Sequence, residues 1–399
     1  MKISLVVPLL LLALSGLAQE TIRSDELLRE RREAVPSSEN YANRRRVRLP
    51  WIQAYEYRTE TERFAWNRQE HVLRISPNTP GMRRAQSRLA GHLRSERAIV
   101  ETMYRNERIE AAYEDWLSLY ISQEQLNHLT RLKAIRADQL ALQQKRLQSM
   151  DTDYKALLSA QEQLNNVRIR RYEAELETHR LRELFGVDTT TVVAFEEMIA
   201  LDEMLLRLSN DSLTAPSPLL AEYHYERELI RREVALEKAE KWQLLDFLQM
   251  RYNGPHDELL EERVQLRAGF VLPTSASRNL KLEELRLKQE ALTREREVKQ
   301  EKLTLRIAEQ RSLVHNHIRV YRQLARTKDE ELAQLQKIAQ TVAQRRGTDP
   351  DLLLKVKEDT EKISLEKLAR RDEIYAHYLR YLALTGRLFA NPEQNLLAE

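Results

Sequence analysis

The fold of this chain is decided by the stretch Val264-Gln265-Leu266-Arg267-Ala268-Gly269-Phe270-Val271-Leu272-Pro273 and by the long polar segment that follows it. Apolar and mostly polar residues alternate up to Leu272, and this period of two is typical of a strand with one apolar face. A sheet that separates lipid from water needs this pattern. Because Pro273 cannot donate a hydrogen bond to a neighbouring strand, we expect the strand to end there.

The segment after this strand predicts one very long helix. From Ala276 to about Arg345 the chain lacks Pro and Gly and is dominated by Leu, Glu, Arg, Lys and Gln. At ~1.5 Å per residue such a helix is roughly 105 Å long, so its stability must come from packing against other helices. Gly347-Thr348-Asp349-Pro350 then predicts a reversal, because Gly suits a left-handed helix end and Asp and Pro suit the next helix start. We expect the returning helix to end near Gly386.

The composition agrees with a helical protein and excludes several classes of function. The chain has 399 residues, of which 42% are hydrophobic and 32% charged, and only 8 are Gly, which argues against a large Gly-rich enzyme fold. The 65 basic and 62 acidic residues nearly cancel, so the net charge gives no reason to expect a nucleic-acid partner. The absence of Cys excludes disulfides, thiolate metal sites and Cys nucleophiles.

The N-terminus has the features of a secretory signal peptide. Lys2 precedes an apolar run from Ile3 to Leu14, and small residues follow up to Ala18, where we expect cleavage. An uncleaved anchor is the alternative. No later stretch approaches the ~20 apolar residues of a transmembrane helix, so any membrane span must consist of strands.

The order of strand, turn, helix, reversal and helix also occurs in the first half of the chain. Alternating residues from Tyr55 to Glu62 and a second arm up to Pro77 predict a β-hairpin. Its aromatic residues suit either a bilayer interface or the core of a small soluble hairpin. A helix up to about Arg146, interrupted only at Gly91, reverses and returns to Leu184. Pro77 matches Pro273, and Thr152 and Asp153 match Thr348 and Asp349, all at an offset of 196 residues.

These signals divide the chain into a signal peptide, two repeats and a linker. Residues 1–18 form the signal peptide, and 19–186 form the first repeat, with a short helix over 21–34, the β-hairpin over 51–76 and the helical hairpin over 81–186. The linker covers 187–218 and contains a short helix expected from Val192 to Leu208. The second repeat covers 219–399, with a helix, β-strands over 244–273, a helical hairpin over 275–387 and a C-terminal tail. We therefore expect four strands in all.

Two stretches carry a resemblance to a known family. The stretch from Arg345-Arg346-Gly347-Thr348 to Leu384-Thr385-Gly386-Arg387-Leu388 resembles the helix reversal and returning helix of the TolC-like outer-membrane efflux proteins. Ala268-Gly269-Phe270-Val271-Leu272-Pro273 resembles their strand-to-helix junction. The resemblance implies a mainly α fold with a small β part, in which each repeat combines a strand pair with a long antiparallel coiled-coil hairpin. It also implies a homotrimer, whose strands form a β-barrel in outer-membrane lipid and whose helices form a periplasmic tunnel.

The same resemblance implies a function and a docking site. The protein would be the passive channel of a tripartite efflux or type I secretion system, bound to a periplasmic adaptor and through it to an inner-membrane transporter. The two helix reversals would form the entrance that contacts the adaptor. These docking residues are Ser149, Met150, Asp151, Thr152, Asp153, Arg345, Arg346, Gly347, Thr348 and Asp349. Two departures from the family matter here. Asp349 stands where the family often has a basic residue, and the positions of the aspartates that narrow the entrance in its best-known member correspond roughly to Leu353 and Val356 in this chain. The residues of the family's gate are therefore not carried over.

The sequence offers no support for an enzyme. It has no His-Glu-x-x-His, no Gly-x-x-x-x-Gly-Lys loop and no Gly-x-Ser-x-Gly elbow. His315 and His317 are two positions apart and point in different directions on a helix, so we expect solvated side chains rather than a metal pair. We expect no cofactor. The alternative to a channel is a periplasmic coiled-coil adaptor or chaperone-like structural protein, which the charged side chains Glu56, Arg58 and Glu60 would suit.

Overall fold

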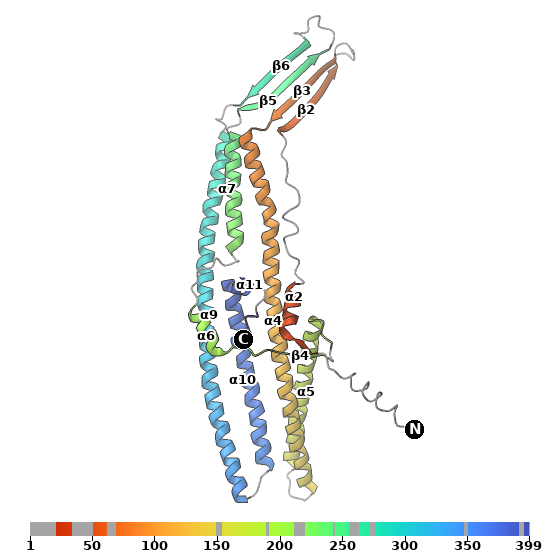
Figure 1. The fold of residues 1–399 in the computed structure, drawn as a ribbon, viewed down its shortest axis with the longest axis vertical. Coiled ribbons are helices and arrows are strands. Elements are labelled where there is room, and N and C mark those ends of the chain that lie inside the picture. The colour runs from red at the N-terminus through yellow and green to blue at the C-terminus, as the bar shows by residue number, and fades with distance from the viewer. Residues whose placement is uncertain are drawn as a thin grey trace, which may run out of the picture. The chain divides into compact units, whose positions relative to one another are not determined.

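A computed structural model of the chain describes residues 21–33, 51–61, 69–148, 154–188, 191–210, 220–241, 244–254, 263–271, 276–346, 350–390 and 395–398. The chain divides into two compact units (Figure 1). The first unit comprises Met1–Pro36, Arg105–Ala215 and Thr304–Glu399, and the second comprises Ser37–Tyr104 and Pro216–Leu303. The long helices α4 (Pro80–Gln148) and α9 (Ala276–Arg346) contribute residues to both units.

The second unit contains a four-stranded antiparallel sheet. Its strands are β2 (Ile52–Thr61), β3 (Gln69–Pro77), β5 (Leu245–Asn253) and β6 (Val264–Phe270), and they pair in the order β2-β3-β5-β6. Each predicted hairpin therefore forms, and the pairing of β3 with β5 joins the two hairpins into one sheet. The strand predicted from its alternating residues is confirmed as β6.

Helix α7 (Ala221–Lys241) packs on α4 and α9 in the same unit. The ring of His92 on α4 stacks on that of Tyr225 on α7 with 4.3 Å between centroids, and its Nε2 donates to the Tyr225 carbonyl at 2.9 Å. The Tyr223 hydroxyl donates to Glu295 on α9 at 3.1 Å. These contacts fix α7 between the two long helices through polar atoms as well as apolar area.

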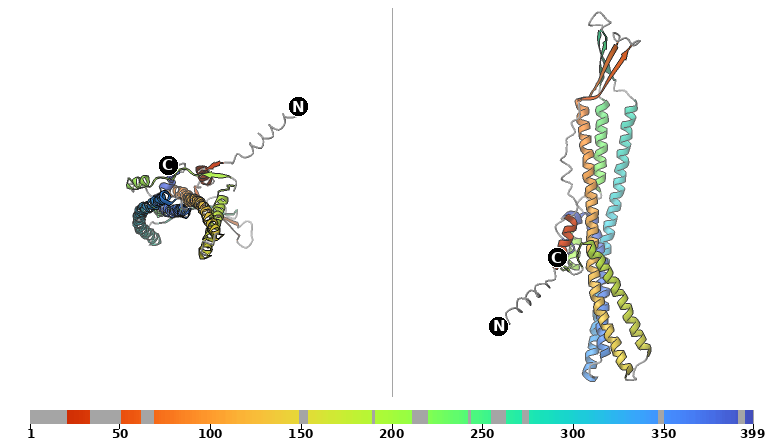
Figure 2. Two further views of the ribbon diagram at one scale, coloured as in Figure 1. Left: turned by 90° about the horizontal axis from the view of Figure 1, so that it is seen from below. Right: turned by 90° about the vertical axis from the view of Figure 1, so that its right-hand side faces the viewer.

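The first unit consists of two antiparallel helical hairpins and a set of short elements. Helix α5 (Tyr154–Leu184) runs back along α4, and α10 (Pro350–Thr385) runs back along α9 (Figure 2). The left-handed backbone of Gly186 (φ 68°) and Gly386 (φ 77°) ends the two returning helices as the sequence predicts. The short elements are β1 (Thr21–Arg23), α2 (Ser24–Glu33), β4 (Val192–Ala194), α6 (Leu201–Ser209) and α11 (Arg387–Ala390).

The core of this unit is built from α4 and α10 and is closed by the short elements. Trp116 is fully buried, and its indole Nε1 donates to the Ser24 carbonyl at 3.2 Å. Phe195 meets the Trp116 ring edge-on at 5.6 Å. The Tyr375 hydroxyl donates to the Ile199 carbonyl at 3.3 Å. Segments far apart in the sequence are therefore held on one aromatic core.

Several local predictions are wrong. The helix expected from Val192 to Leu208 begins only at Leu201, because Val192–Ala194 forms β4 and pairs in parallel with β1, at the start of the helix expected over 21–34. The described residues thus contain six strands rather than four. Tertiary pairing that buries Val193 overrides the local helical pattern. Gly91 does not interrupt α4. The predictions for residues 1–18, 149–153 and 347–349 lie outside the described residues.

Gly269 offers a test of the sheet. A Cβ at this position would clash with Cε1 of Phe247, and the centre of that ring also lies 3.9 Å from the Arg74 guanidinium. We expect Gly269→Ala to cost about 1–3 kcal/mol through overpacking. Gly91→Ala is the matched control, since a Cβ there meets nothing within 4 Å and should be neutral or stabilising by up to ~1 kcal/mol. Guanidinium unfolding followed by tryptophan fluorescence measures both, and equal midpoints for the two variants would contradict the packing argument.

Candidate functional site

One face of the sheet is apolar across all four strands. Residues that pair across antiparallel strands point to the same face, so the register places Tyr57, Leu73, Met250 and Leu266 in one row. Leu266 is 81% exposed and Tyr55 is 78% exposed. The apolar face comprises Tyr55, Tyr57, Leu73, Ile75, Leu248, Met250, Leu266 and Ala268. An exposed, continuous apolar surface of this kind marks contact with lipid or protein.

The opposite face is charged. The Arg251 guanidinium contacts the Glu70 carboxylate at 2.5 Å, and Arg58 Nε donates to Glu56 at 2.6 Å. The register adds a row across all four strands to the same face: Glu56, Arg74, Gln249 and Arg267. The sheet therefore has one face suited to an apolar medium and one suited to water.

The two edges of the described sheet are open. Strands β2 and β6 each pair with a single neighbour, so one side of each strand presents unpaired backbone N–H and C=O groups. The 10 residues of β2 extend about 33 Å at ~3.3 Å per residue. This length matches a bilayer-spanning strand of ~9–11 residues.

Aromatic side chains lie near both ends of the strands. At one end the His71 ring stacks on that of Tyr252 with 6.2 Å between centroids, and His71 Nδ1 also hydrogen-bonds the hydroxyl of Tyr57, in the middle of β2, at 2.7 Å. At the other end, the Arg83 guanidinium lies 3.8 Å from the centre of the exposed Trp51 ring. Rings with an apolar body and a polar tip are typical of the membrane–water interface.

The part of the chain that the structure describes holds neither a membrane-spanning helix nor a cluster of metal ligands. No helix in it is long and apolar enough to cross a membrane. No group of three or more His, Asp and Glu side chains among the same residues is placed to hold a metal ion.

Only two of the ten predicted docking residues fall within the described part of the chain. Arg345 and Arg346 are the last residues of α9, and 149–153 and 347–349 lie outside the described residues. The residues that border both reversals are in contact, because Arg146 near the end of α4 forms an ion pair with Asp351 in the first turn of α10. This ion pair joins the first hairpin to the second.

A buried ion network joins the hairpins further along. Glu358 on α10 is only 2% exposed, and it accepts hydrogen bonds from Arg136 at 2.6 Å and Gln139 at 2.9 Å on α4. Burial works to raise the pKa of the Glu358 carboxyl, but the hydrogen bonds from Gln139 and Lys362 and the charge of Arg136 together lower this pKa below its usual value. Glu358 is therefore a carboxylate at neutral pH.

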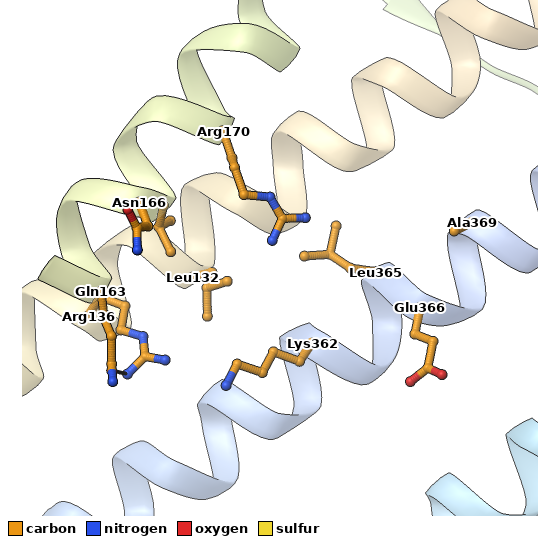
Figure 3. Close-up of a pocket in the computed structure, with 10 residues that line it drawn as sticks. Leu132, Arg136, Gln163, Asn166, Arg170, Lys362, Leu365, Glu366 and Ala369 are labelled. Atoms are coloured by element: carbon orange, nitrogen blue, oxygen red, sulfur yellow. Dashed lines mark hydrogen bonds between the residues drawn. The ribbon is translucent and has the colours of Figure 1, made fainter. Parts of the chain in front are cut away.

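A cavity of about 450 Å³ lies beside this network, between α4, α5 and α10 (Figure 3). Arg170 extends from α5 toward Leu365 on α10, whereas Glu366 points away (Figure 3). Three cations, Arg136, Arg170 and Lys362, contribute to its lining. Since its lining comes from both hairpins, the cavity is part of the contact between them.

Exposed apolar residues follow one helix of the first hairpin at spacings of three, four and eleven. They are 53–71% exposed and comprise Tyr154, Leu158, Ile169, Tyr172 and Leu176 on α5. Helix α9 carries the exposed residues Leu305, Val320 and Ile338 in the same unit. Apolar residues at such spacing on exposed helices are typical of helix–helix interfaces.

The prediction for the histidines is partly wrong. His315 bonds only the Arg311 carbonyl of its own helix, at 2.9 Å, as expected of a surface residue. His317, however, stacks on His377 of α10 with 4.8 Å between ring centroids and lies 3.3 Å from Glu373. The spacing within one helix contains no sign of a partner on another helix.

The long helical hairpins, the small four-stranded sheet and the short elements beside them together form the TolC-like channel fold. No protein-family model matches the chain, and no curated protein matches its sequence. Solved structures do match: a membrane protein from Pseudomonas aeruginosa has a TM-score of 0.60 at 10% identity, covering 90% of this chain and 86% of that chain. The Campylobacter jejuni CmeC outer membrane channel has a TM-score of 0.57 at 12% identity, and the match covers 91% of this chain and 82% of CmeC. The open state of the Neisseria gonorrhoeae MtrE outer membrane channel has a TM-score of 0.58 at 12% identity, and the match covers 92% of this chain and 88% of MtrE. The fold that the resemblance implies is confirmed.

Glu358 tests the connection between the hairpins. We expect Glu358→Leu to cost about 3–5 kcal/mol, because it leaves the guanidinium of Arg136 buried without its carboxylate. Glu366→Leu on the same helix is the control, since Glu366 is exposed. Urea unfolding monitored by circular dichroism gives both values. A loss below 1 kcal/mol for Glu358→Leu, or an equal loss for both variants, would show that the network is not required.

His377 tests the pH dependence of the second hairpin. Burial, His317 and Arg380 lower the pKa of His377, and they outweigh Glu373, which raises it. The unfolded chain then binds this proton more readily, so stability falls as pH falls through about 6.5, the ordinary His value. We expect His377→Gln to reduce the loss in melting temperature between pH 7.5 and 5.5. His315→Gln should match the wild type, and identical pH dependence in all three proteins would refute the expectation.

Proposed function

We propose that this chain is the subunit of an outer-membrane channel, a passive duct through which a separate transporter exports its cargo. The observation that carries the proposal is the sheet with one apolar and one charged face, of bilayer-spanning length, with both edges open. No backbone group can remain unpaired in lipid, so such a sheet is compatible with a membrane only when other copies pair with its edges.

In our proposal, three copies of the chain pair with one another at the open edges of their sheets. Four strands from each chain close into one barrel, as in the arrangement that the resemblance implies, with the apolar face toward lipid and the charged face toward water. The exposed apolar residues on α5 and α9 also support association of copies, because no element among the described residues covers them.

The similar structures agree with this function. CmeC and MtrE are outer membrane channels by name. Identities of 12% carry the fold to this chain, and the channel function is our inference from the fold together with the two-faced sheet. Nothing in the described site supports catalysis, so we propose a transport protein and not an enzyme.

The finer parts of the proposal rest on the sequence. The chain would be exported by a signal peptide over 1–18, with the sheet in the outer membrane and the helices in the periplasm. A periplasmic adaptor, and through it an inner-membrane transporter of an efflux or type I secretion system, would dock at 149–153 and 345–349. Opening of this entrance would move the hairpins apart and so break the nearby ion pair between Arg146 and Asp351.

The alternative, a periplasmic coiled-coil protein, predicts a sheet packed on itself or on protein. It has the charged face in its favour, but a side chain such as Leu266, 81% exposed, has no covering element among the described residues. Washing the membranes with alkaline carbonate distinguishes a channel from a periplasmic protein. A channel stays in the washed membranes and is extracted by detergent with a native mass near three chains, whereas a periplasmic protein is released as a monomer or dimer.

Substitutions on the two faces of β6 sharpen this test. We expect Leu266→Arg to reduce both membrane retention and the trimer fraction, because a charge facing the bilayer midplane costs about 2–4 kcal/mol in each chain. Gln265→Arg is the matched control on the opposite face and should keep both. Equal behaviour of the two variants, or release of the wild type by carbonate, would refute a lipid-facing sheet.

A further inference from the structure

A second cavity, of about 470 Å³, lies between the short helix α6 and the long helix α9. Helix α6 and the part of α9 that lines this cavity both belong to the first unit, and they lie side by side in Figure 1. The floor is apolar, formed by Leu205 of α6 and by Ile318, which is 1% exposed. We call this feature the α6–α9 groove; its remaining lining residues are His315, Asn316, Arg319, Arg322, Gln323 and Arg326.

The wall that α9 contributes to the groove is basic. Arg319, Arg322 and Arg326 are three and four positions apart, so they lie on one helix face along about 10 Å at ~1.5 Å per residue. Arg322 pairs with Asp202 of α6. Arg319 contacts only the neutral side-chain oxygen of Asn316, at 3.4 Å, and Arg326 has no ion-pair partner among the described residues.

Other cations of α9 do have acidic partners one turn away, as in Lys288–Glu284 at 2.8 Å and Lys328–Glu331 at 3.0 Å. Like charges one turn apart repel and destabilise a helix, and among the described residues only Arg322 of this row forms an ion pair. An anionic partner would remove this cost.

We propose that the α6–α9 groove binds an acidic segment of a partner protein. Guanidinium groups bind carboxylates through two parallel hydrogen bonds, so carboxylates two helical turns apart, at seven-residue spacing, match Arg319 and Arg326. An apolar side chain between these carboxylates would lie on Leu205 and Ile318. Small-molecule sites usually bury most of their ligand, whereas the arginines here are exposed along an open helix face, which favours a peptide over a small anion.

The groove is distinct from the proposed docking residues at the helix reversals, and the inference does not rest on the channel function. Arg319, Arg322 and Arg326 lie at least 19 positions before Arg345 on the same helix, which is roughly 28 Å along its axis. A partner at the groove would therefore contact a different part of the first unit from a partner at the reversals.

The test uses the purified full-length protein and a fluorescein-labelled twelve-residue peptide with the repeat Glu-Leu-Ala-Glu. We expect saturable binding by fluorescence anisotropy that weakens with salt, and at least a tenfold loss of affinity in Arg319→Glu/Arg326→Glu. Arg294→Glu/Arg306→Glu is the matched control, with two exposed arginines on the same helix outside the groove, and should bind like the wild type. A peptide with Lys in place of Glu should bind only the Arg319→Glu/Arg326→Glu variant.

Circular dichroism and native mass establish that each variant is folded and assembled. Equal losses in the two double variants, or no binding of the acidic peptide, would overturn the proposal. Binding of inorganic pyrophosphate but not of the peptide, with the same dependence on Arg319 and Arg326, would identify a small-anion site instead. A native mass that falls only in Arg319→Glu/Arg326→Glu would identify the groove as a contact between copies of this chain, and would overturn the proposal as well.

Discussion

Backbone hydrogen bonding at the edges of the sheet is the constraint on which the rest of this structure depends. Within the described chain, the edge strands β2 and β6 have backbone hydrogen-bond partners on one side only. The side chains on one face of the four strands also make that face of the sheet apolar. In water this arrangement is a risk of aggregation, and in lipid it is not permitted unless the edges close. The exposed apolar residues on α5 and α9 have the same explanation, since they too need other chains. In the channel that we propose, the isolated subunit would therefore be an incomplete structure, and assembly would be part of its folding.

The long helices impose a second requirement, because helices of 69 and 71 residues cannot be held by local propensity. Apolar packing around Trp116 fixes the middle of the first unit, and the contacts of Arg136 and Gln139 with Glu358 fix the first hairpin against the second. Replacing a buried ion pair by apolar residues is often neutral for stability, so such pairs are better suited to specifying one register. We interpret the network around Glu358 in this way: along helices of repetitive composition, it distinguishes the correct alignment from a slip by one turn.

The sequence predicted those features whose signal is local, and it missed those that depend on distant segments. Alternation identified β6, and the glycines at the ends of α5 and α10 identified where the returning helices stop. The pairing of β1 with β4 joins three-residue strands about 170 positions apart, too short to show a period. His317 shows the same limit, because spacing within α9 cannot indicate a partner on α10. Of the docking residues, those at 149–153 and 347–349 remain a prediction from the sequence.

The two repeats also differ in a way that bears on the α6–α9 groove. In the first half, the short helix α2 provides the cation and the long helix the acid, through Arg31 and Asp115 at 2.6 Å. In the second half the polarity is reversed, since Asp202 is on the short helix α6 and Arg322 is on the long helix α9. In these two ion pairs the long helix thus contributes the carboxylate in one case and the guanidinium in the other. A partner with an acidic segment therefore has a physical reason to choose the α6–α9 groove, where Arg319 and Arg326 form no ion pair among the described residues.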